Sequence, residues 1–121
     1  MKIRFAIAVA MIIVAVGAAY AHDVKGTPIA ITATVVDTAC YMAGEAPGPK
    51  HTACATMCAK NGAPLALADE KGKVYMVLGP EHKNPNTQLM PFIEKKVKVS
   101  GTLVERGGIS AIAIKTVEAA E

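Results

Sequence analysis

The residues with the most evident chemistry are three cysteines and one histidine in a short stretch of the chain, Cys40, His51, Cys54 and Cys58. If residues 51–60 form a helix, the histidine and the last two cysteines share one face of it, because positions three, four and seven apart are neighbours on a helix. Cys40 follows the preceding strand, just before the loop that leads to this helix. The sequence therefore predicts that one imidazole and three thiols converge.

This set of donors suits a soft metal ion. Three thiolates and one imidazole match the tetrahedral coordination of Zn²⁺, and the Cys-x3-Cys spacing lies within the range of structural zinc sites. Soft sulfur ligands also suit Cu(I), for which Met42 and Met57 could add thioether ligands, and iron–sulfur sites use similar donors. We expect any metal held by these four residues to be zinc or copper.

A disulfide is the alternative use of the same cysteines. Exported proteins fold under oxidising conditions, and three cysteines allow one bridge and one remaining thiol. Cys54 and Cys58 lie one helical turn apart, which is poor geometry for a bridge, whereas Cys40 could pair with either and stabilise the domain by about 2–4 kcal/mol. A redox-active thiol pair is a third interpretation, although the chain has no Cys-x2-Cys motif. All three interpretations remain open.

The N-terminal residues have the pattern of a cleavable signal peptide. Lys2 and Arg4 precede an apolar run over residues 5–19, and small residues flank position 20 before a cleavage site after Ala21. The apolar run is shorter than the roughly 20 residues that a membrane-spanning helix needs. We therefore predict a signal peptide over residues 1–21, a periplasmic or secreted protein, and no membrane span after cleavage.

The composition of the remaining chain excludes several functions. Without Lys2 and Arg4, eleven basic residues face ten acidic ones, which is not the basic surface that nucleic-acid binding requires. The 100 residues left are enough for one domain with a modest aliphatic core, because the chain has no tryptophan and little phenylalanine. The chain carries no Gly-x-Ser-x-Gly, His-Glu-x2-His or phosphate-binding glycine motif, so we expect no enzyme.

Alternating apolar and polar residues predict five strands. Residues 29–37 place isoleucine, alanine and valine on one face and threonine on the other, which is typical of a half-buried strand, and Asp37 is interpreted as a turn residue at its end. Gly101 lies inside a long strand and indicates a bulge or a sharp bend. The other predicted strands cover residues 63–69, 73–78, 95–105 and 109–116.

Short helical segments interrupt these strands. A flexible lead-in over residues 22–28 comes first, a helix over 51–60 ends at Asn61-Gly62, and a helical turn over 87–94 follows the third strand. A mainly β chain with five strands, a short helix after strand 1 and a helical turn between strands 3 and 4 fits an OB-like Greek-key barrel, here over residues 29–118. A small α+β sandwich is the alternative.

Four segments together resemble a family of small exported bacterial proteins with an OB-like barrel and a three-Cys, one-His N-terminal segment. The segments are Val35–Cys40, His51–Pro64, Lys73–Val77 and Lys96–Thr102, and the resemblance covers roughly residues 30–117. It implies the barrel, export, and Cys40, His51, Cys54 and Cys58 as site residues, but no biochemical function. Tyr41 stands where relatives often have glycine.

Taken together, these features predict an exported domain that binds a soft metal through the Cys3His cluster. The alternative function is that of a disulfide-stapled interaction module, without metal or catalysis, which docks a protein partner in the cell envelope. In that case the cysteines are purely structural.

Overall fold

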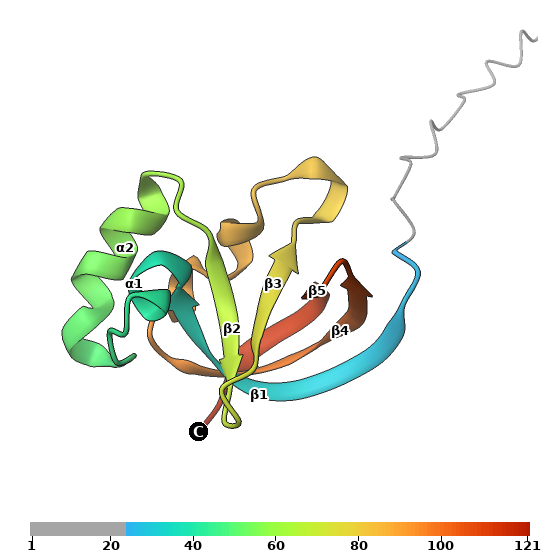
Figure 1. The fold of residues 1–121 in the computed structure, drawn as a ribbon, viewed down its shortest axis with the longest axis horizontal. Coiled ribbons are helices and arrows are strands. Elements are labelled where there is room, and N and C mark those ends of the chain that lie inside the picture. The colour runs from blue at the N-terminus through green and yellow to red at the C-terminus, as the bar shows by residue number, and fades with distance from the viewer. Residues whose placement is uncertain (1–23) are drawn as a thin grey trace, which may run out of the picture.

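A computed structural model describes residues 24–121, which form a mainly β domain (Figure 1). The predicted signal peptide lies outside the described residues. The strands are β1 (Thr27–Asp37), β2 (Leu65–Asp69), β3 (Val74–Leu78), β4 (Lys96–Arg106) and β5 (Ile109–Ala119). Two helices, α1 (Thr38–Met42) and α2 (Thr52–Lys60), lie between β1 and β2. Short 3-10 turns cover Pro49–His51, Pro80–His82, Pro85–Gln88 and Met90–Phe92.

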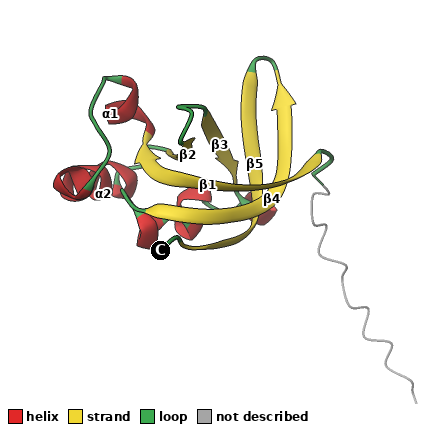
Figure 2. Ribbon diagram, turned by 90° about the horizontal axis from the view of Figure 1, so that it is seen from below, coloured by secondary structure: helices red, strands yellow, loops and turns green. Residues whose placement is uncertain are grey.

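The five strands close into a barrel in the order β1-β2-β3-β5-β4 (Figures 1 and 2). β1 closes it by pairing antiparallel with β2 through its second half and with β4 through its first. β3 and β5 pair in parallel, and the other neighbours are antiparallel. This is the strand order of an OB-type barrel, so the predicted fold class is confirmed.

Gly101 lies at a bulge in β4, where this strand pairs with β5, as predicted. The register of β4 against β5 shifts between Ser100 and Gly101. A Cβ atom added at Gly101 would lie 2.2 Å from the carbonyl oxygen of Ala113, so no larger residue fits without moving the backbone. The bulge lets the long β4 bend around the barrel, which closure requires.

The barrel interior is filled by aliphatic side chains, as the composition predicted. Its buried members include Val35, Leu67, Val97 and Ile112, with Tyr75 as the aromatic contribution of β3. Helix α2 packs on this core through its buried alanines 55 and 59, whose small side chains allow a close approach. Each of these alanines directly follows a cysteine, so Cys54 and Cys58 lie on the face of α2 beside the one that packs on the core.

The start of the domain differs from the prediction. β1 begins at Thr27, so that Thr27 and Pro28, assigned to a flexible lead-in, pair with Leu103 and Thr102 of β4. The predicted helix over residues 51–60 is confirmed as α2, preceded by a 3-10 turn. At the other end, β5 extends to Ala119.

Helix α1 was not predicted, because five residues are too few to show a helical period. It forms where β1 ends, since Asp37 caps it: Oδ1 accepts hydrogen bonds from the N–H groups of Ala39 (2.8 Å) and Cys40 (3.4 Å). Thr38 anchors the same turn through its hydroxyl, which donates to the carbonyl oxygen of Pro64 at 2.7 Å. The sequence analysis had assigned Asp37 to a simple turn. The structure places Cys40 on this helix, whereas the sequence analysis had placed it after the strand, just before the loop.

Candidate metal centre

The four predicted site residues come from the insertion between β1 and β2. Cys40 lies on α1, His51 ends the 3-10 turn before α2, and Cys54 and Cys58 lie on α2. Both helices lie at the same end of the barrel in both views (Figures 1 and 2). The insertion therefore brings side chains from two helices to one place.

Three of the four residues form a compact group. A ring nitrogen of His51 and the Sγ atoms of Cys40 and Cys54 all lie within 4.8 Å of one another. Two sulfur ligands of one tetrahedral zinc ion lie roughly 3.8 Å apart, given Zn–S distances of about 2.3 Å. The limit of 4.8 Å for this group exceeds that spacing by about 1 Å. Cys54 is exposed, whereas the other two are half-buried.

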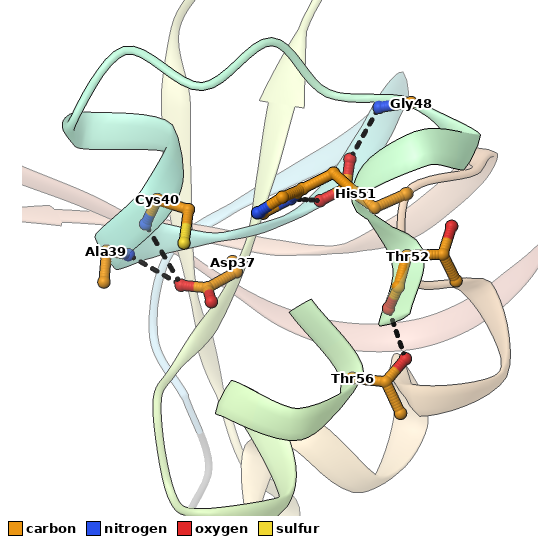
Figure 3. A network of polar contacts seen from close by, with 8 residues as sticks. Asp37, Ala39, Cys40, Gly48, His51, Thr52 and Thr56 are labelled. Carbon is orange, nitrogen blue, oxygen red and sulfur yellow. Dashed lines mark hydrogen bonds and ion pairs between the residues drawn. The ribbon is translucent and has the colours of Figure 1, made fainter. Parts of the chain in front are cut away.

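His51 is held in place by the buried carboxylate of Glu94, which lies 43 positions later in the sequence. Its Nδ1 lies 3.0 Å from Oε1 of Glu94, and Oε2 of Glu94 accepts a hydrogen bond from the N–H of Gly48 at 2.8 Å. The Glu94 side chain is only 1% exposed. Figure 3 shows the other ring nitrogen of His51 pointing toward Cys40. Metal-binding histidines have this arrangement: one ring nitrogen is hydrogen-bonded to a carboxylate, and the other faces the remaining ligands of the metal, here thiols.

The carboxylate also changes the proton affinity of His51. The hydrogen bond to Glu94 raises the pKa of His51 above its ordinary value, and the negative charge of Glu94 adds to the effect, against the opposing influence of burial. With Nδ1 bonded to the carboxylate, Nε2 is the nitrogen left for a metal ion.

Glu94 was missed by the sequence analysis, which assigned it to the end of a helical turn. It has a positive φ of 61°, which is uncommon for a residue with a side chain. Its backbone N–H donates to the carbonyl oxygen of Val35 at 2.8 Å, next to an isolated bridge between Val35 and Ile93. These contacts fix the strained backbone and aim the side chain at His51. A charged residue directly after Phe92-Ile93 was the only signal in the sequence.

Cys58 lies in a second, overlapping group. A carboxylate oxygen of Asp37 and the Sγ atoms of Cys40 and Cys58 lie within 4.8 Å of one another. Asp37 is 1% exposed, and its Oδ2 has no hydrogen-bond partner among the described residues. The structure thus brings together all four predicted residues as two groups that share Cys40, and adds Asp37.

The thiols in this second group hold their protons firmly. Hydrogen bonding to the Asp37 carboxylate and burial raise the pKa of the Cys58 thiol to about 12. Burial, followed by the negative charge of Asp37, raises the pKa of Cys40. Both thiols are therefore protonated in the metal-free protein at neutral pH. A metal ion must displace those protons in order to bind.

The two methionines near the cysteines are turned to solvent. Met42 is 77% exposed and Met57 is 67% exposed. All three cysteines are unpaired within residues 24–121.

Comparisons with known proteins leave this site to be interpreted from its own geometry. A scan against models of protein families, a search of curated proteins and a search of solved structures each gave no match. No helix in the described part of the chain is long and apolar enough to cross a membrane.

Proposed function

We propose that this protein is an exported OB-like domain that binds a soft metal ion, zinc or copper, through Cys40, His51, Cys54 and Cys58. The observation that carries the proposal is the convergence of two thiols on a histidine whose far side is bonded to the buried Glu94. Buried carboxylates rarely occur without a partner, and one placed behind a partly buried imidazole is typical of metal sites.

Each residue of the site has a separate role in the proposed metal binding. Glu94 keeps the proton of His51 on Nδ1, so that Nε2 can offer its lone pair to a metal ion. The thiols become ligands by losing their protons, and binding is therefore coupled to proton release. Helix α2 fixes the spacing of Cys54 and Cys58, while the Asp37 cap fixes the turn that carries Cys40.

The exposure of Cys54 favours a site that exchanges its ion with solvent or with a partner over a closed structural site. We propose binding and not catalysis, since the sequence carries none of the hydrolytic or acyl-transfer motifs. The proposed location is the periplasm or the exterior of the cell, and the proposed partner for exchange is a protein of the cell envelope.

A disulfide-stapled interaction module is the second candidate function. The observation in its favour is that Cys40 Sγ lies within 4.8 Å of the sulfur of Cys54 and also of the sulfur of Cys58. Either bridge would tie α1 to α2 after a small movement, with a stabilisation of about 2–4 kcal/mol. The barrel would then present its surface to a protein partner.

Metal and thiol content, measured on one sample, separates the two functions. The protein is purified from the periplasm without a polyhistidine tag, its metals are quantified by mass spectrometry, and its thiols are counted after unfolding without reductant. We expect bound zinc or copper together with three thiols. Absence of metal with a single thiol would assign the protein to the disulfide module.

The metal content of variants that lack one ligand tests where the metal binds. Cys54→Ser and His51→Gln should both lose most of the bound metal, because each removes a ligand of the first group. Met57→Leu is the matched control, since this exposed residue lies on the same helix between two of the cysteines. Equal metal content in all of these proteins would contradict the assignment.

A further inference from the structure

Cys40 belongs to both groups of ligand atoms, and this shared position suggests more than one metal ion. Resting on the function proposed above, we propose that the site holds two zinc ions bridged by the Cys40 thiolate. The first lies between Cys40, His51 and Cys54, and the second between Asp37, Cys40 and Cys58.

The geometry separates the two positions. The ligand atoms within each group lie within 4.8 Å of one another, but the four cysteine and histidine ligands do not form one such group among the described residues. Cys58 associates with Asp37, whereas His51 associates with Cys54. A single tetrahedral ion would need all four ligands within roughly 3.8 Å of one another. Two ions on either side of Cys40 each need only three ligand atoms that already lie within 4.8 Å of one another.

The carboxylate of Asp37 independently indicates a ligand. One of its oxygens caps α1, but Oδ2 is buried and has no partner within the described chain. Buried polar atoms are nearly always satisfied, and the thiols near this carboxylate are only weak hydrogen-bond donors, so the negative charge of Asp37 is incompletely compensated. A zinc ion between Asp37, Cys40 and Cys58 would satisfy this oxygen.

The balance of charge also favours two divalent ions. Three thiolates and one carboxylate carry four negative charges, which two Zn²⁺ ions neutralise. One ion in the first group would balance only the Cys40 and Cys54 thiolates and leave the charge of the buried Asp37 carboxylate without a cation. The Glu94 carboxylate is outside this set, because N–H donors from His51 and Gly48 satisfy both of its oxygens.

The mixture of donors identifies zinc as the metal. Zinc accepts thiolate, imidazole and carboxylate ligands together, while Cu(I) selects sulfur. A thiolate bridge with Zn–S distances of about 2.3 Å would hold the two ions no more than roughly 4.6 Å apart. Each ion would have three protein ligands and one position for water or for a ligand of a partner.

The test counts metal ions in the reduced full chain. Native mass spectrometry during zinc titration gives the stoichiometry, and ¹¹³Cd NMR of the cadmium-loaded protein detects a bridging sulfur as coupling between two resonances. We expect two ions per chain and two mutually coupled resonances. Asp37→Asn should reduce the stoichiometry to one ion and one resonance, because an asparagine still caps α1 but is a poor zinc ligand.

Two further variants keep the test decisive. Cys58→Ser should also reduce two ions to one, which covers the case in which Asp37→Asn does not fold. Glu118→Gln, an exposed acid-to-amide change on β5, should retain two ions.

The outcomes distinguish this inference from the function on which it rests. One ion in the wild-type protein, unchanged in Asp37→Asn and Cys58→Ser, would overturn the second position and remove Cys58 from the proposed ligands, while metal binding through Cys40, His51 and Cys54 would still stand. Two ions in all of the variants would overturn Asp37 and Cys58 as ligands. No ion in the wild-type protein would overturn both proposals.

Discussion

Replacement of Glu94 by glutamine tests whether the proposed metal site depends on a carboxylate that lies outside the cysteine–histidine motif. In the wild-type protein Oε1 faces Nδ1 of His51 at 3.0 Å and Oε2 accepts from the N–H of Gly48 at 2.8 Å. A glutamine offers one acceptor oxygen and one NH₂ group that only donates. One of the two N–H donors must then face another donor, and His51 loses its negative partner.

The expected loss is about 10–100-fold in zinc affinity, the usual effect of removing the partner behind a metal-binding histidine. The loss should shrink in acid. The hydrogen bond to Glu94 raises the pKa of His51, so protons compete with zinc at a higher pH in the wild-type protein than in the variant. The ratio of affinities is therefore greater at pH 8 than at pH 6.

Competition against a chromophoric chelator measures both affinities. Glu70→Gln is the matched control, because Glu70 makes only an exposed ion pair with Lys96 at 3.2 Å. Circular dichroism confirms that each variant is folded. A Glu94→Gln affinity within twofold of wild type at pH 8, in a folded protein, would refute the view that Glu94 positions His51.

Three further predictions concern stability and thiol reactivity. Asn86→Ala should lower the free energy of unfolding by about 2–4 kcal/mol in denaturant titrations, because the N–H of Leu65 and a carbonyl oxygen after α2 lose their buried partner; a loss below 0.5 kcal/mol would contradict this. Gly101→Ala should cost about 1–3 kcal/mol in the same assay, since its Cβ would collide with a β5 carbonyl oxygen, and an unchanged midpoint would show that the bulge can relax. In the metal-free protein Cys58 should be alkylated slowly below pH 9, because a rise in its pKa from 9.0 to about 12 leaves roughly a thousandfold less thiolate. Site-resolved mass spectrometry should show faster alkylation in Asp37→Asn, and equal rates in the two proteins would contradict the role of the carboxylate.

The barrel was predictable because its signals are local. Alternation along residues 29–37 identified β1, and a glycine inside a long β-branched segment identified the bulge at Gly101. The Asn61-Gly62 stop signal placed the end of α2 within one residue. Each of these features depends on neighbouring residues and on the period of a single element.

The supporting residues of the site were not predictable in the same way. Glu94 meets His51 across 43 positions of sequence, and only the closed barrel brings them together. Asp37 resembled an ordinary turn residue, since a helix of five residues has no period to reveal its cap. The cysteine–histidine pattern identified the candidate ligands, but the position of Cys58 near Asp37 depends on tertiary geometry.

X-ray absorption at the zinc edge tests the central claim of thiolate and imidazole ligation most directly. The zinc-loaded wild-type protein should show sulfur neighbours at about 2.3 Å and nitrogen or oxygen neighbours at about 2.0 Å, with multiple scattering from an imidazole ring that disappears in His51→Gln. A zinc ion surrounded only by nitrogen and oxygen, or a spectrum unchanged in that variant, would contradict the account.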